Sequence, residues 1–195
     1  TVEELGKYPP NEGTPQLLAA ISGWLRARHG IEVPPEGITS VNGTREGLFN
    51  AALALCPETK GGQTPAILIP NPFYQVYAVA AVASEADPVY VPATAATGFL
   101  PDYAALPAET LDRVTVAYLC SPANPQGAVA SLDYWLELLA LAEKHDFKIF
   151  ADECYSEIWR TAPPPGALAV ADAIEALEQA LAQLHRHTGA AVEYL

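Results

Sequence analysis

The chain has 195 residues, half of them hydrophobic, which is enough to bury one sizeable core and favours a single main domain. It carries 23 acidic against 10 basic residues, a net charge of −13, and lacks the basic stripe that a nucleic-acid partner requires. No segment has the unbroken apolar run of a membrane span, and residues 1–4 lack the features of a signal peptide. We therefore expect a cytoplasmic protein with no membrane partner.

The predicted elements alternate between helices and strands. In chain order they are a helix at residues 14–29, a strand at 38–41, a helix at 45–55, a strand at 66–70, a helix at 74–84, strands at 88–91 and 114–120, a helix at 132–144, a strand at 148–151 and a helix at 169–185. This alternation predicts an α/β fold of three layers, in which helices cover both faces of a mostly parallel sheet. The first helix places Leu17, Ile21, Trp24 and Leu25 on one apolar face.

The cysteines and histidines indicate neither a disulfide nor a metal site. Cys56, Cys120 and Cys154 are an odd number without close pairs, which favours reduced thiols. Only His185 and His187 are close in sequence, and residues two apart on a helix face different directions. We therefore expect no metal.

A turn at residues 42–47, Asn-Gly-Thr-Arg-Glu-Gly, leads from a predicted strand into a predicted helix. The free N–H groups at such a helix terminus bind anions such as phosphate. The segment lacks the lysine of a Walker loop and the glycine spacing of a dinucleotide fingerprint. The alternative is an ordinary glycine-containing turn.

Polar residues also follow two later strands. Asp152 and Tyr155 follow the apolar stretch 147–151, and the segment 121–127, Ser-Pro-Ala-Asn-Pro-Gln-Gly, follows the strand before it. Ligands of open α/β sheets bind at the carboxyl ends of strands. The alternative for Asp152 is that it caps a following helix.

Taken together, these segments resemble the cofactor site of class I/II aminotransferases, which use pyridoxal 5′-phosphate (PLP). The resemblance implies that Asp152 holds the protonated ring nitrogen, which makes the cofactor an electron sink. Asn124 and Tyr155 then hydrogen-bond the phenolate oxygen of the ring. The residues at the turn, Gly43, Thr44 and Arg45, then hold the phosphate.

Two tyrosines extend this resemblance. Residues 70–77 are similar to the Pro-x-Pro-x-Tyr-x-x-Tyr segment of the family, in which Tyr74 stacks on the pyridine ring. The alternative is a core aromatic at a helix start. Residues 7–13 resemble a stretch whose tyrosine, here Tyr8, reaches the phosphate of the neighbouring subunit, which implies a homodimer.

The resemblance covers residues 5 to about 168. Within the family, residues 42–49 and 70–77 resemble bacterial succinyldiaminopimelate aminotransferases of lysine biosynthesis. The resemblance implies amino-acid and 2-oxo-acid substrates. It also divides the chain into an entry loop and helix at 1–37, a PLP-binding large domain at 38–160, a Pro-rich linker at 161–168 and a C-terminal helix at 169–195. The small domain of the family is absent, so we expect an incomplete large domain.

The chain departs from the family at the residue that matters most for catalysis. In the family a lysine about thirty residues beyond the Asp-x-x-Tyr motif forms a Schiff base with the cofactor, and no lysine follows Lys148 here. The lysines of the chain are Lys7, Lys60, Lys144 and Lys148, and none matches that motif. We therefore assign no catalytic residue, and expect a truncated or internally deleted chain that does not transaminate.

Two further functions stay open at this stage. A non-catalytic remnant with the same fold could bind PLP weakly or associate with a partner, through a dimer surface or through the apolar stripe of the last helix, Ile174, Leu177, Leu181 and Leu184. A PLP-dependent lyase or decarboxylase is the other possibility, because the ring-binding residues do not determine which bond is cleaved.

Overall fold

The computed structural model describes residues 6–188, except the side chains of 177, 178 and 180–188. The helices are α1 (Pro15–His29), α2 (Thr44–Leu55), α3 (Gln75–Ala83), α4 (Ala108–Leu111), α5 (Leu132–His145) and α6 (Ala167–Thr188), with short 3-10 turns η2 (Pro35–Gly37) and η3 (Ala95–Thr97). The strands are β1 (Ala66–Asn71), β2 (Asp87–Pro92), β3 (Val114–Cys120) and β4 (Lys148–Asp152). The chain divides into two compact units, residues 1–42 with 172–195, and Gly43–Ala171.

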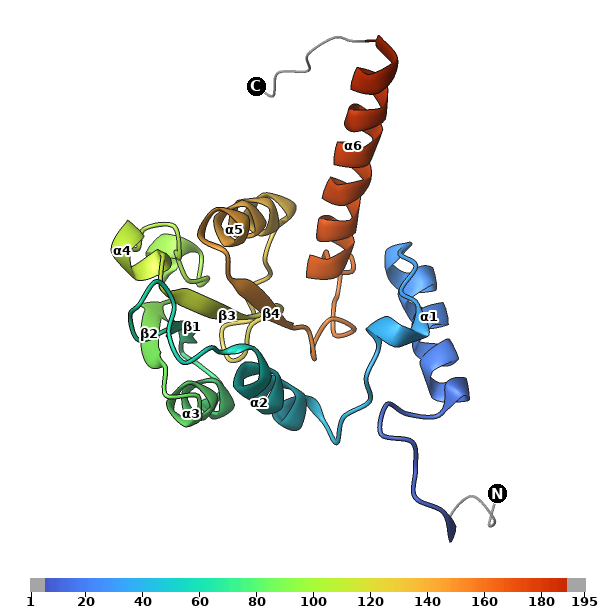
Figure 1. The fold of residues 1–195 in the computed structure, drawn as a ribbon, viewed down its shortest axis with the longest axis horizontal. Coiled ribbons are helices and arrows are strands. Elements are labelled where there is room, and N and C mark those ends of the chain that lie inside the picture. The colour runs from blue at the N-terminus through green and yellow to red at the C-terminus, as the bar shows by residue number, and fades with distance from the viewer. Residues whose placement is uncertain (1–5, 189–195) are drawn as a thin grey trace. The chain divides into compact units, whose positions relative to one another are not determined.

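The larger unit is built on a four-stranded sheet in the order β2-β1-β3-β4, and every neighbouring pair is parallel. The central strands β1 and β3 are buried along almost their whole length, as strands covered on both faces are. In Figure 1, α2 and α3 lie on one face of the sheet and α5 lies on the other. The predicted three-layer α/β fold is therefore confirmed.

Alternation along the strands sorts the core between the two faces. Ile67 and Ile69 of β1, with Val116 and Tyr118 of β3, pack against α2 and α3 in one cluster. That cluster also takes in Tyr77 of α3. The parallel register continues to the last residues of β3 and β4, where Cys120 pairs with Asp152. All the strands thus deliver their carboxyl ends to one edge of the sheet.

The predicted strand at residues 38–41 is wrong. The backbone N–H of Ile38 closes the 3-10 turn on Pro35, and that of Ser40 donates to the carbonyl of Glu12, in a loop. No neighbouring strand pairs with this segment in the part of the chain that the structure describes. A short apolar run cannot form a strand without a partner to accept its hydrogen bonds.

Helix α1 begins and ends as its sequence predicts. The Thr14 side chain accepts from the backbone N–H of Leu17, and Pro15 occupies the first helical position. Gly30 ends the helix with a left-handed φ of 75°. Of the predicted apolar face, however, Leu17 and Trp24 are 46% and 44% exposed.

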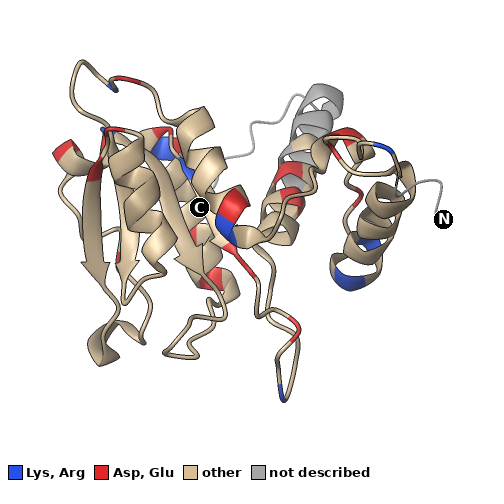
Figure 2. Cartoon of the chain, turned by 90° about the horizontal axis from the view of Figure 1, so that it is seen from below, with Lys and Arg blue, Asp and Glu red and all other residues tan. Residues whose placement is uncertain are grey.

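Helix α6 begins two residues before its predicted start and extends to Thr188. Ile174 is half-buried, whereas the side chains of Leu177, Leu181 and Leu184 lie outside the described residues. Figure 2 shows acidic residues distributed over the described helices and loops, with few basic residues among them. Among the helices described, none is long and apolar enough to cross a bilayer.

Candidate functional site

A pocket of about 510 Å³ lies at the carboxyl ends of the strands. Its lining comes from the segments that follow β1, β2, β3 and β4 and from the start of α2, and it includes Thr44, Tyr74, Asn124, Asp152 and Tyr155. Five of the eight predicted site residues therefore share one cavity, at the edge where open α/β sheets bind ligands. Asp152 is the only carboxylate in that lining, which contains no Lys, Arg or His.

Asp152 ends β4 and is 5% exposed. The Tyr77 hydroxyl donates a 2.7 Å hydrogen bond to its Oδ2 atom. Its Oδ1 atom is buried and has no hydrogen-bond partner among the described residues. No helix follows directly, because the chain enters a turn at Cys154, so the helix-capping alternative does not apply.

The position of Asp152 follows from the strand that carries it. Phe150 packs on Tyr118 with its ring edge-on at 5.4 Å, on the face covered by α2 and α3. Residues two apart in a strand point to the same face, so Asp152 is directed toward α3, where Tyr77 lies. The next residue has a different task, since the Glu153 carboxylate accepts from the first backbone N–H of α6, at Ala167.

Asn124 and Tyr155 lie together in the pocket lining. The amide nitrogen of Asn124 donates a 2.9 Å hydrogen bond to the Tyr155 hydroxyl oxygen. Because that oxygen already accepts a hydrogen, the hydroxyl hydrogen of Tyr155 is left to donate to a ligand. Ser121 fixes the preceding loop, since its hydroxyl accepts from the backbone N–H of Ala130 and its own N–H donates to the carbonyl of Asp152.

The turn before α2 carries the predicted anion site. Gly43 is the N-cap residue with φ of 105°, a conformation that favours glycine, and it offers no side chain to cap the helix. Thr44 lines the pocket, whereas Gly43 and Arg45 do not. The Arg45 guanidinium instead donates a 2.6 Å hydrogen bond to the Tyr74 hydroxyl. Tyr8 belongs to the other unit, has a fully exposed side chain, and is not part of the pocket lining.

Sequence reasoning missed three residues that surround Asp152. Burial and the hydrogen bond to Asp152 raise the pKa of Tyr77 well above its usual range. Loss of solvent in the pocket wall and the nearby Asp152 carboxylate likewise raise the pKa of the Cys120 thiol, and raise that of Cys154 to about 12. Tyr77 could have been found as the last residue of the Pro-x-Pro-x-Tyr-x-x-Tyr segment, one helical turn beyond Tyr74.

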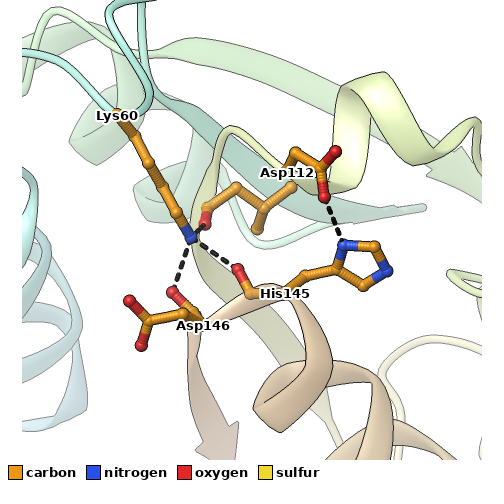
Figure 3. A network of polar contacts seen from close by, with 5 residues as sticks. Lys60, Asp112, His145 and Asp146 are labelled. Carbon is orange, nitrogen blue, oxygen red and sulfur yellow. Dashed lines mark hydrogen bonds and ion pairs between the residues drawn. The ribbon is translucent and has the colours of Figure 1, made fainter.

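None of the four lysines is among the residues that line the pocket. Lys60 is held at the opposite end of the sheet, where its ammonium donates 2.6 Å hydrogen bonds to the carbonyls of Val114, His145 and Asp146 (Figure 3). Beside it, Nδ1 of His145 lies 2.7 Å from Oδ1 of Asp112. Burial lowers the pKa of Lys60, and the carboxylates of Asp146 and Asp112 oppose that shift. Lys148 begins β4 at this same amino end of the sheet.

The described residues contain no group of three or more His, Cys, Asp or Glu side chains able to hold a metal ion. The lining instead fits the ring of PLP. A buried carboxylate with one oxygen to spare suits a pyridinium N–H, and a Tyr hydroxyl suits a phenolate. The uncapped start of α2 suits a phosphate.

Comparison with known proteins agrees with this fold. The sequence model of the family "Aminotransferase class I and II" matches residues 2–192. An LL-diaminopimelate aminotransferase of Desulforudis audaxviator is 37% identical over 171 residues, which are 87% of this chain and 42% of that protein. The chain belongs to the class I and II aminotransferase family.

Solved structures of aminotransferases also superpose on this chain. An aminotransferase from Neisseria meningitidis superposes with a TM-score of 0.83 at 36% identity, over 90% of this chain and 44% of its own. A probable N-succinyldiaminopimelate aminotransferase from Thermus thermophilus superposes with a TM-score of 0.66 at 28% identity, over 78% of this chain and 40% of its own. The chain is thus related to both kinds of diaminopimelate aminotransferase, and spans about two fifths of their length.

Proposed function

We propose that this chain binds PLP non-covalently in the pocket at the carboxyl ends of the strands, and does not transaminate by itself. The observation that carries the proposal is Asp152, the lone carboxylate of the pocket lining, which keeps a buried oxygen without a partner among the described residues. An unsatisfied buried acceptor is costly, so its retention favours a ligand that donates to it.

Four polar residues of the lining hold the cofactor in this proposal. When bound, PLP supplies an electron sink for bonds at the amino-acid α-carbon. Asp152 Oδ1 holds a proton on the ring nitrogen, and Tyr155, oriented by Asn124, donates to the phenolate oxygen. The Thr44 hydroxyl and the first N–H groups of α2 hold the phosphate.

The same lining supports the absence of transamination. It contains no amine that could bond to the cofactor, and no Lys or His that could carry a proton to or from the α-carbon. A nucleophile and a base must both lie within reach of the reacting atoms. No lysine lines the pocket, and Lys60 is engaged with three carbonyls at the other end of the sheet.

For the parent enzyme of this chain, we propose amino transfer between an amino acid of the diaminopimelate type and a 2-oxo acid, in lysine biosynthesis. The support is the likeness to LL-diaminopimelate and N-succinyldiaminopimelate aminotransferases. We also propose a homodimer, because Leu17 and Trp24 leave an apolar stripe of α1 exposed. Sedimentation should then show a dimer, and Trp24→Ser should shift it toward monomer; a wild-type monomer at all concentrations would contradict the dimer.

Titration with PLP tests the cofactor proposal. Asp152→Asn should weaken PLP binding by roughly 10- to 100-fold and change the absorption spectrum of the bound cofactor, because a neutral amide cannot hold the pyridinium as a carboxylate does. The matched control is Glu153→Gln, the adjacent carboxylate, which caps α6 and leaves the pocket intact. Equal affinities for the two variants would remove Asp152 from its role.

A further inference from the structure

Tyr77 is a buried tyrosine in the pocket wall whose hydroxyl and ring both have well-defined partners. Its side chain is 1% exposed, and its hydroxyl donates to Asp152 Oδ2 at 2.7 Å. Its ring stacks on Tyr118 at 4.3 Å with planes 13° apart, and Tyr74 meets it edge-on at 5.9 Å. Tyr118 is itself tied to α2 by a hydrogen bond to the carbonyl of Leu48. The hydroxyl of Tyr77 therefore has little freedom to leave Asp152.

This arrangement makes the two oxygens of Asp152 different. Oδ2 is occupied by the tyrosine, while Oδ1 is buried without a described partner, in a residue that lines the pocket. A carboxylate with one oxygen held by a rigid donor cannot turn about its own bond without losing that hydrogen bond.

The hydroxyl acts in this pair only as a donor. Burial, with a smaller effect from Asp152, raises the pKa of Tyr77, so the phenol keeps its proton throughout the neutral range. The thiols of Cys120 and Cys154 also stay protonated there, because their pKa values are raised. Neither the Tyr77 hydroxyl nor these two thiols therefore adds a negative charge next to the Asp152 carboxylate in the pocket lining.

We propose that Tyr77 is a positioning residue, which orients Asp152 so that Oδ1 accepts from the ring nitrogen of the cofactor. The inference rests on the proposed PLP binding and adds a specific claim to it. Tyr77 should affect binding through the ring nitrogen alone, and not through the general shape of the pocket.

Two ligands separate these roles. PLP and 1-deaza-PLP, in which a C–H group replaces the ring nitrogen, should be titrated into the wild-type chain, Tyr77→Phe and Tyr103→Phe. The control Tyr103 is equally buried and its hydroxyl donates to the carbonyl of Tyr118, but it does not line this pocket. We expect the wild type to prefer PLP, Tyr77→Phe to reduce that preference about tenfold, and Tyr103→Phe to retain it.

Other outcomes would each overturn a defined claim. If Tyr77→Phe lowered the affinities for PLP and 1-deaza-PLP equally, Tyr77 would have only a structural role. If Tyr77→Phe left the preference for PLP unchanged, the inference would be wrong, although the proposed PLP binding would stand. A wild-type chain that binds neither ligand would overturn the proposed function itself. A double variant completes the test if Tyr77→Phe proves unstable: in an Asp152→Asn background, Tyr77→Phe should alter the preference no further, and an additional tenfold loss there would contradict action through Asp152.

Discussion

Lys60 at the amino end of the central sheet and Asp152 at its carboxyl end differ in how their polar atoms are paired. At the amino end, the Lys60 ammonium donates to three backbone carbonyls and His145 lies against Asp112. At the carboxyl end, Asp152 has one oxygen bonded to Tyr77 and one without a partner among the described residues. Polar groups that are saturated within the chain stabilise it, whereas one left open is available to a ligand. We therefore expect Lys60, at the amino end of the sheet, to matter for stability, and Asp152, at the carboxyl end, to matter for ligand binding.

The largest expected effect follows from the absence of any lysine among the residues that line the pocket. Borohydride reduction of the PLP-loaded chain should give no stoichiometric pyridoxyl-lysine, and amino donors should show no turnover. Acid–base assistance alone is typically worth 10²–10⁴-fold, and here the nucleophile is missing as well. Peptide mapping by mass spectrometry provides the measurement. A single modified lysine together with turnover would contradict the contrast between the two ends, most sharply if it were Lys60.

A smaller effect concerns the thiol of Cys154 at the pocket end. Its pKa, raised to about 12 by loss of solvent and by the Asp152 carboxylate, leaves very little thiolate at pH 8. Since the thiolate is the reactive form, alkylation by iodoacetamide should be roughly a hundredfold slower than that of glutathione, and should accelerate as the pH rises toward 12. Asp152→Asn should restore only part of the rate, because loss of solvent is the larger cause. If Cys154 were alkylated as fast as glutathione, its surroundings in the pocket wall would not raise the pKa of its thiol.

The sequence predicts best those features that depend on residues close together in the chain. The buried strands β1 and β3 are predicted to within one residue, because apolar runs bounded by turn residues leave few alternatives. The carboxyl end of β4 places Asp152 at the ligand edge for the same reason. The segment 38–41 fails because strand formation depends on a partner that local sequence does not contain.

Features that depend on long-range packing could not be predicted. Lys60 bonds to residues 54, 85 and 86 positions further along the chain, and Tyr77 to one 75 positions further. These contacts exist only once the helices have docked on the sheet. A family motif can mark a residue such as Tyr77, but only the folded structure shows which oxygen of Asp152 its hydroxyl bonds to.

The smallest effect is one of stability at the amino end. Lys60→Met should lower the free energy of unfolding by about 2 kcal/mol, because it removes charged hydrogen bonds to three carbonyls and leaves those carbonyls without their donor. The matched control is Lys148→Met, an exposed lysine at the same end of the sheet, which should change stability by less than about 0.5 kcal/mol. Urea unfolding followed by circular dichroism measures both. PLP affinity should be unchanged in the two variants, because the pocket lies at the other end of the strands. A Lys60→Met chain that unfolds like the wild type but loses PLP would reverse the assignment of stability to one end and binding to the other.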